Sequence, residues 1–302
     1  MNPLKDYICY YITSCATFDK NMKLSNNLLC ILVILVFFTN CKNDINLEKN
    51  EIEKSDSQLK IIKKRQDSLI DVHLKNGAWK YSYYSSEWQS EIDKGLAKDS
   101  TIAYMWQQKA MPLFKQGKYE IGMEYIDKAV KYDRQRWQDY RAFIKCIFAK
   151  TYREAIKDFE DYKKRFGYGY VMDHTYDFHI GLSYLQLNEF KKAEQIFKID
   201  YEKQLSEHGE DWLHPVDLFY YGISKYEQGK YKEAIDLFDL ALKIHTRFSD
   251  VQYYKALSLG KIGKIEEAKE LMKIAENNGK LGFSFNEDNA VYERYPYQVR
   301  WK

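Results

Sequence analysis

The feature that most constrains the fold of this chain is a small residue that recurs along it, each time followed four positions later by a large apolar residue. The pairs are Gly122 with Ile126, Ala155 with Phe159, Ala193 with Phe197, Ala234 with Phe238 and Ala268 with Met272. The small residues are spaced by 33, 38, 41 and 34 positions. Residues four apart lie on one face of a helix. Each pair therefore predicts a helix that another helix can approach closely.

The segments between these helices predict a partner helix for each one. Turn sequences such as Lys115–Lys118 and Glu227–Lys230 contain glycine and precede the second helix of a unit. Gly181 and Gly222 fall inside first helices, where glycine costs about 1 kcal/mol relative to alanine unless close packing requires it. We therefore expect close helix contacts at both glycines. The predicted two-helix units are 101–133, 136–165, 173–200, 215–245 and 249–276.

This pattern closely resembles the tetratricopeptide repeat, whose period is about 34 residues, over residues 84–278. Gly181 and Tyr184 match the G-x₂-Y step of the family, and Trp106 occupies its tryptophan position. The resemblance implies an all-α, right-handed α-solenoid of helical hairpins, with Glu87–Asp99 as the second helix of a degenerate unit. The residues that pack the repeats are then Gly122, Ala155, Phe159, Gly181, Ala193, Phe197, Gly222, Ala234, Phe238 and Ala268.

Two departures from the family pattern locate its irregular parts. No proline closes the repeats, and the 38- and 41-residue spacings require longer connections. These connections, near 166–172 and 204–213, are expected to be loops or extended helices. Insertions in repeat arrays lie on the surface and often carry specific function.

An apolar run over Leu28–Phe38 resembles the core of a secretory signal. It is shorter than the roughly 20 residues that span a bilayer. Met22 and Lys23 precede it, so we predict that translation starts at Met22 and that residues 1–21 are an over-long gene prediction. Residues 22–40 are then the signal peptide. An uncleaved or buried apolar helix is the alternative interpretation.

The four residues that end at Cys41 resemble the cleavage box of a bacterial lipoprotein, although Phe38 and Asn40 depart from its usual residues. Looser boxes, followed by a short charged segment, are typical of Bacteroidetes lipoproteins. The resemblance implies lipid attachment at Cys41, a flexible tether over 41–57 and a solenoid over 58–280. It also implies a location in the cell envelope, anchored in the outer membrane, on either the periplasmic or the cell-surface face.

A repeat solenoid implies a concave groove lined by first helices, which suits a helix or an extended peptide with hydrophobic anchors. The repeat frame places nine residues near this groove: Phe114, Tyr140, Phe178, Leu182, Phe219, Ile223, Tyr226, Tyr253 and Leu257. The alternative is that many of these side chains form the core between helices.

The sequence offers few candidates for chemistry. A short segment brings together two aspartates and two histidines, Asp173, His174, Asp177 and His179, which could bind a metal. The simpler interpretation is that Asp173 caps a helix and that its neighbours lie on the solvated face. Cys146 lies in an apolar run and is expected to be a buried thiol. We found none of the common nucleotide, hydrolase or zinc motifs. The predictions are therefore no metal, no cofactor and no catalytic residue, in a protein that is not an enzyme.

The last segment, 281–302, is aromatic and lacks helical periodicity. Because repeat arrays need a protected end, we predict a capping tail that folds back on the final hairpin or enters the groove. The net charge of +3 does not suit a nucleic-acid coat. The predicted function is a membrane-anchored scaffold for an unidentified protein or peptide. Alternatives are an assembly factor similar to the repeat lipoprotein of the outer-membrane barrel machinery, and a glycan or nutrient-uptake accessory lipoprotein.

Overall fold

The computed structural model of the chain describes residues 56–301 and separates two units, Met1–Asp67 and Ser68–Lys302. The predicted signal peptide, Cys41 and most of the tether lie outside the described residues. In the first unit, 56–67 are helical. The second unit begins with helical residues 68–70 and a π-helical turn at Asp71–Lys75. Within the described range, none of the helices combines the length and the apolar character needed to cross a bilayer.

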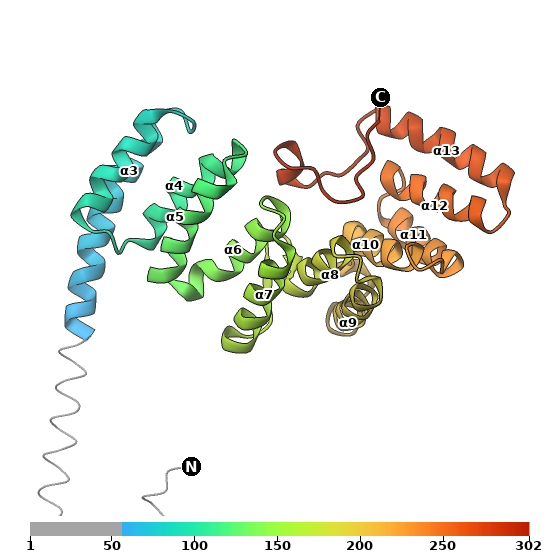
Figure 1. Cartoon of the computed structure of the whole chain (residues 1–302), viewed down its shortest axis with the longest axis horizontal. Coiled ribbons are helices and arrows are strands. Elements are labelled where there is room, and N and C mark those ends of the chain that lie inside the picture. Colours follow the sequence, from blue (N-terminus) through green and yellow to red (C-terminus); the bar gives the residue numbers. More distant parts are fainter. Residues whose placement is uncertain (1–55, 302) are drawn as a thin grey trace, which may run out of the picture. The chain divides into compact units, whose positions relative to one another are not determined.

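The second unit is built almost wholly of helices, and the predicted all-α solenoid is confirmed (Figure 1). Its helices are α3 (Ser86–Lys98), α4 (Ala103–Lys115), α5 (Tyr119–Tyr132), α6 (Arg134–Ile147), α7 (Tyr152–Phe166), α8 (Tyr176–Gln186), α9 (Phe190–His208), α10 (Pro215–Tyr226), α11 (Tyr231–Ile244), α12 (Ser249–Lys261) and α13 (Ile265–Lys280). From α4 onward they form five consecutive antiparallel hairpins. Each second helix also packs on the first helix of the next hairpin, which makes the stack continuous.

Close contact between the two helices of a hairpin depends on glycine at three places. A Cβ built on Gly222 would lie 2.4 Å from Phe238 Cε1, and one on Gly181 would lie 2.8 Å from Phe197 Cε1. At Gly122 the glycine is on the second helix, and the ring that it admits is that of Phe114. Most of the predicted packing residues are buried at these contacts, whereas Ala268 is half-buried on the last hairpin.

The turns inside the hairpins use left-handed backbone. Gly117, Gly229 and Gly263 have φ of 72°, 73° and 86°, a region that glycine enters without steric cost. Asn188 and Lys150 occupy the corresponding positions with φ of 58° and 56°. Glycine, or a residue that tolerates this conformation, therefore closes each hairpin from α4 to α13.

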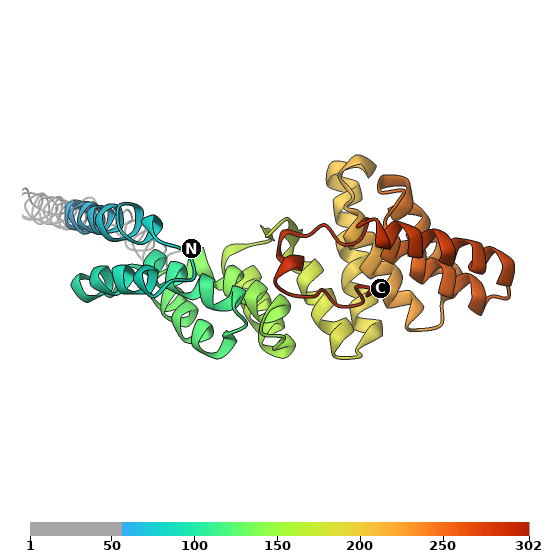
Figure 2. The same ribbon diagram turned by 90° about the horizontal axis from the view of Figure 1, so that it is seen from above.

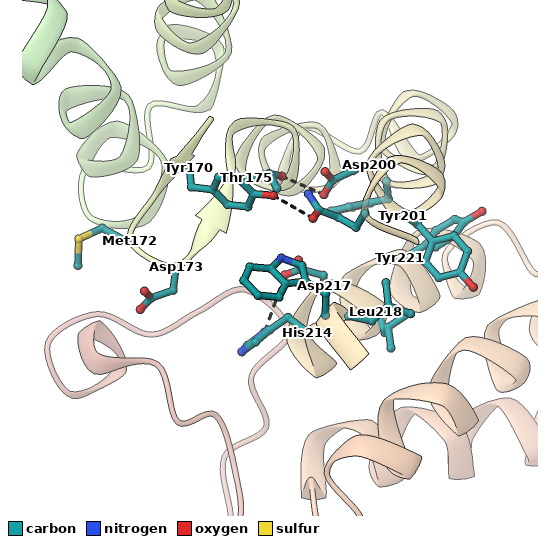
Figure 3. A pocket seen from close by; sticks show the side chains of 14 residues that line it. Tyr170, Met172, Asp173, Thr175, Asp200, Tyr201, His214, Asp217, Leu218 and Tyr221 are labelled. Atoms are coloured by element: carbon teal, nitrogen blue, oxygen red, sulfur yellow. Dashed lines mark hydrogen bonds and ion pairs between the residues drawn. The ribbon is translucent and has the colours of Figure 1, made fainter. Parts of the chain in front are cut away.

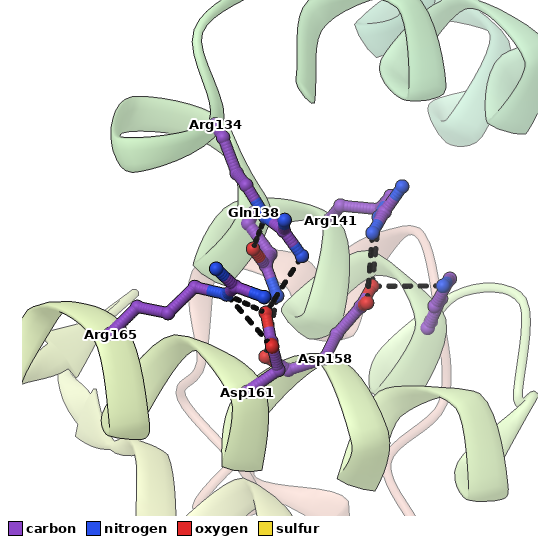
Figure 4. A network of polar contacts seen from close by, with 7 residues as sticks. Arg134, Gln138, Arg141, Asp158, Asp161 and Arg165 are labelled. Atoms are coloured by element: carbon purple, nitrogen blue, oxygen red, sulfur yellow. Dashed lines mark hydrogen bonds and ion pairs between the residues drawn. The ribbon is translucent and has the colours of Figure 1, made fainter. Parts of the chain in front are cut away.

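A polar network joins α6 to α7 (Figure 4). Gln138 is fully buried and donates to the main-chain oxygen of Asp158, at 3.0 Å, and to Asp161 Oδ2, at 2.8 Å. Arg141 donates two hydrogen bonds of 2.8 Å to the Asp158 carboxylate, which also accepts one from Lys145. Bidentate pairs of this kind fix orientation, so the network sets how these two helices meet.

The two long connections have different structures. After α7 the chain forms a short antiparallel ladder of β1 (Tyr170–Val171) and β2 (His174–Thr175). In the second connection, α9 itself is extended to His208, and a 3₁₀ turn at Glu210–Trp212 follows. Asp173 does not cap α8, because it has φ of 68° in the turn between the strands. The cap is Thr175, whose hydroxyl accepts from the Phe178 amide at 2.9 Å.

Substitution of Gly222 by alanine tests the close contact. Gly222→Ala should lower the free energy of unfolding by about 1–3 kcal/mol, because the new methyl overlaps the Phe238 ring. Gly260→Ala is the matched control in α12, where the new Cβ would meet only Ala268 Cβ, at 3.9 Å. That variant should be neutral, or more stable by up to about 1 kcal/mol, through helix propensity. Equal effects of the two substitutions in urea unfolding would contradict the packing argument.

Candidate functional site

The first helices of the hairpins form a surface that we call the inner face, made by α4, α6, α8, α10 and α12. The C-terminal tail, residues 282–301, lies on it. Figures 1 and 2 show the tail leaving the end of α13, looping over the preceding hairpins and returning. Its Phe285 ring lies 5.5 Å from the ring of Phe219 and 5.3 Å from that of Phe248, and Tyr295 stacks on Phe285 from the returning leg. The tail therefore enters the groove, one of the two arrangements expected from the sequence.

Polar contacts anchor the main chain of the tail. Tyr220 Oη donates to the main-chain oxygen of Pro296 at 2.7 Å. Asp250, buried at the start of α12, accepts from the Val299 amide at 2.6 Å and from the Ser284 hydroxyl at 2.7 Å. Burial raises the pKa of Asp250 despite these hydrogen bonds. One carboxylate thus binds both legs of the tail.

The predicted groove residues fall into three groups. Five are buried with the tail in place: Phe114, Phe178, Leu182, Phe219 and Ile223. Of these, Phe219 contacts the tail's Phe285, and Phe114 lines a cavity beside the tail. Tyr140, Tyr226 and Tyr253 are half-buried on first helices, and the Tyr253 ring meets that of Trp301 in the tail. Leu257 lies on the last hairpin beside Ala268 and Met272, away from the tail. The repeat frame placed all nine on first helices, and the contacts of Phe219 and Tyr253 with the tail lie on the inner face.

One part of the inner face keeps an opening. A cavity of about 320 Å³ lies between α4, α6 and the tail's 3₁₀ turn at Asp288–Val291. Met111 and Tyr140 line it on the helices, and Tyr292 lines it from the tail. Lys115 lies 4.6 Å from the centre of the Tyr292 ring. The helices line it with apolar and aromatic side chains and with Lys115, and the tail adds Asp288 and Asn289.

A second cavity, of about 440 Å³, lies where the two long connections meet α9 and α10 (Figure 3). Tyr201, Leu218 and Tyr221 supply apolar walls, and Trp212, 61% exposed, stands at the connection between the helices. The sequence placed specific function at these connections. Hairpin β1–β2 and the long α9 are what create the cavity.

Asp200 is the buried polar group of this second cavity. It accepts hydrogen bonds from Tyr168 Oη at 2.7 Å and from Thr175 Oγ1 at 2.9 Å. Burial, together with the nearby charge of Asp217, raises its pKa to about 6 in spite of these hydrogen bonds. At neutral pH the folded protein therefore holds a buried charge that costs free energy.

Beside the cavity, His174 lies between two carboxylates. Its Nδ1 is 2.6 Å from Asp217 Oδ1, and its Nε2 is 3.3 Å from Glu287 Oε2 of the tail. Burial alone would lower the pKa of His174, but the two carboxylates raise it to about 10. The ring of His214, at the start of α10, lies 5.0 Å away. Among the described residues, His174, His214 and Glu287 are grouped closely enough to hold a metal.

The other members of the 173–179 segment point elsewhere. Asp177 pairs with Lys163 of α7. His179 Nε2 is 3.2 Å from the Val171 oxygen, and burial lowers the pKa of this ring to about 3. Cys146 is buried against Ser183, and burial raises the pKa of its thiol to about 12, which keeps it protonated. The compact cluster suggested by the sequence is therefore not a single site.

Sequence reasoning missed His214, Asp217 and Glu287. A signal for the first two was available, because His174 lies two residues before α8 and His214 lies directly before α10, the first helices of consecutive hairpins. The starts of such helices are neighbours in a stack. Glu287 could not be placed, since the path of the tail does not follow from any repeat.

Comparisons with known proteins agree with this fold. Residues 218–245 match the family model described as "Tetratricopeptide repeat". The crystal structure of PilW, titled a widely conserved type IV pilus biogenesis factor, is 13% identical with a TM-score of 0.56, and the match covers 75% of this chain and 97% of that one. A tetratricopeptide repeat protein from Parabacteroides merdae is 14% identical with a TM-score of 0.54 and coverage of 72% and 87%.

A third structure is the C-terminal part of a repeat protein from Cytophaga hutchinsonii. It is 16% identical with a TM-score of 0.50, and the match covers 72% of this chain and 80% of that one. The search of curated proteins found no match. At these identities the likeness shows the fold alone. The chain is thus a solenoid of tetratricopeptide-type hairpins.

The buried charge of Asp200 predicts how stability depends on pH. Its folded pKa, about 6, lies above the usual 3.8, so the folded state retains a proton that the unfolded chain releases. The contribution of Asp200 to stability is therefore greatest below about pH 4 and is lost as the pH rises through 6. Relative to wild type, Asp200→Asn should gain roughly 2.5 kcal/mol between pH 4 and pH 7.5. Urea unfolding of both proteins across this pH range, in buffer that contains EDTA, measures the difference. Parallel profiles of unfolding free energy against pH would contradict the raised pKa of Asp200.

Proposed function

We propose that this chain is a membrane-anchored scaffold that binds an extended segment of another protein on its inner face. The observation that carries the proposal is the tail itself. It is a non-helical, aromatic stretch of chain, held by ring contacts and by hydrogen bonds to its backbone. A surface that binds one such segment in the same molecule has the chemistry to bind a similar one from a partner.

The open stretch of the inner face suits a hydrophobic anchor. The cavity at Met111 and Tyr140 borders the tail but is not filled by it. Apolar and aromatic walls favour an aromatic or aliphatic side chain of the partner, and Lys115 at the edge favours a nearby acidic group or an aromatic ring. The partner segment would thus continue along first helices beyond the part that the tail covers.

Anchoring is the second element of the proposal. The motif ending at Cys41 supports lipid attachment, and two or more acyl chains hold a protein stably on a membrane. The charged segment after it supports an outer-membrane location. The barrel-assembly and glycan-uptake alternatives share this anchor, and they differ in the partner: a barrel-insertase subunit in the first case and an oligosaccharide in the second.

Crosslinking in cells tests partner binding. A photoreactive amino acid at Met111, on the inner face, should yield a discrete crosslinked product whose partner is identified by mass spectrometry. The matched control is Lys198 of α9, whose side chain is 59% exposed and which belongs to a second helix. Equal crosslinking at the two positions, or none at Met111, would contradict inner-face binding. A barrel-insertase subunit as the partner would select the assembly alternative.

The anchor has its own test. Cys41→Ala should move the protein from the membrane fraction to the soluble fraction, because it removes the residue that carries the acyl chains in this proposal. Cys146→Ala is the control, since that thiol is buried in the solenoid and cannot be acylated there. Membrane retention of Cys41→Ala in immunoblots of fractionated cells would overturn the lipid attachment.

A further inference from the structure

A cluster of side chains from three separate parts of the fold meets at the edge of the second cavity. His174 comes from β2, His214 from the start of α10 and Glu287 from the C-terminal tail. One potential ligand atom from each lies within 4.8 Å of the other two. His174 is 1% exposed, whereas the side chain of His214 is 38% exposed. The cluster is therefore buried on one side and reachable from solvent on the other.

The nitrogen that faces this cluster has no hydrogen-bond partner. His174 Nε2 is buried and lies 3.3 Å from Glu287 Oε2, but the pair lacks the geometry of a hydrogen bond. The opposite ring nitrogen, Nδ1, is held by Asp217 at 2.6 Å. The ring is thus held by Asp217 at Nδ1, and its Nε2 faces Glu287 and the cluster.

The separations fit a metal ion. Zinc binds histidine nitrogen and carboxylate oxygen at about 2.0–2.2 Å in a tetrahedral arrangement, which puts two ligand atoms about 3.3–3.6 Å apart. The observed 3.3 Å between His174 Nε2 and Glu287 Oε2 lies within this range. His214 Nδ1 accepts from the Val216 amide at 3.3 Å, which leaves its Nε2 as the ligand atom. Closing the cluster from within 4.8 Å to metal-ligand separations would require a rotation of the His214 ring, whose side chain is 38% exposed.

We propose that His174, His214 and Glu287 bind one zinc ion, with Asp217 as a positioning residue that orients His174. Two histidines and one glutamate are a known zinc ligand set, and it leaves a fourth position for water. A carboxylate on the far nitrogen of a ligating histidine is the usual support of such sites. The two carboxylates, which together carry two negative charges, also favour a divalent cation at this place.

The site ties the tail to the solenoid. Two ligands belong to the hairpin stack, and the third belongs to a segment that returns along the inner face. Bound zinc therefore stabilises the docked tail by its own binding free energy. This consequence gives a readout that does not depend on any partner or activity.

The test uses the full chain purified in detergent, stripped with EDTA and then dialysed against micromolar zinc. We expect one zinc per chain by elemental analysis and a four-coordinate visible spectrum with Co²⁺. His214→Ala and Glu287→Gln should each weaken zinc binding by more than about 100-fold, and Asp217→Asn by about 10- to 100-fold. His245→Ala is the matched control, a half-buried histidine outside the cluster, and should bind zinc like wild type.

Limited proteolysis gives the second readout. Zinc should slow cleavage within residues 282–301 of wild type and of His245→Ala, but not of Glu287→Gln. Circular dichroism of each variant distinguishes lost ligands from lost fold. The proposal is overturned if wild type retains no zinc, if Glu287→Gln binds as wild type does, or if zinc binds without protecting the tail. Crosslinking at Met111 is measured separately, so failure of the metal site and failure of partner binding are distinguishable.

Discussion

Close approach of the two helices in each hairpin is the constraint on which the rest of the structure depends. An aromatic ring of one helix lies directly over a glycine of the other, as Phe238 does over Gly222 and Phe197 over Gly181. Because the ring fills the space of the missing side chain, the hairpin closes without a void. Closed hairpins expose an apolar side to the next unit, and this is why they stack.

The stack in turn creates a face that its own repeats do not cover. First helices of successive hairpins lie next to one another, and their aromatic side chains would contact water if nothing lay on them. The tail covers much of this face with Phe285 and Tyr295, and Asp250 accepts hydrogen bonds from both of its legs, from the Ser284 hydroxyl on one and from the Val299 amide on the other. A segment that must satisfy its own backbone groups can lie on a solenoid only where such acceptors exist. The same requirement would apply to any partner.

The two long connections, after α7 and after α9, bring buried polar and charged side chains together. Strand β2 brings Thr175 to Asp200 and brings His174 between Asp217 and Glu287. All of these charged groups are mostly buried, so their energies depend on partners from other elements and not on their own local sequence. This is where the proposed zinc site and the pH-sensitive carboxylate lie.

The sequence by itself determined the helices, the hairpins and their order, because helical spacing and the recurring small residue are local properties of the chain. It located the connections that deviate from the repeat, and it placed glycine where rings press against a helix. It could not tell which residues of the first helices are buried, as Phe178 and Phe219 are once the tail is in place. Only the tertiary structure decided the path of the tail and the meeting of His174, His214 and Glu287. Those contacts join residues far apart in the chain, and no local pattern encodes the distance between them.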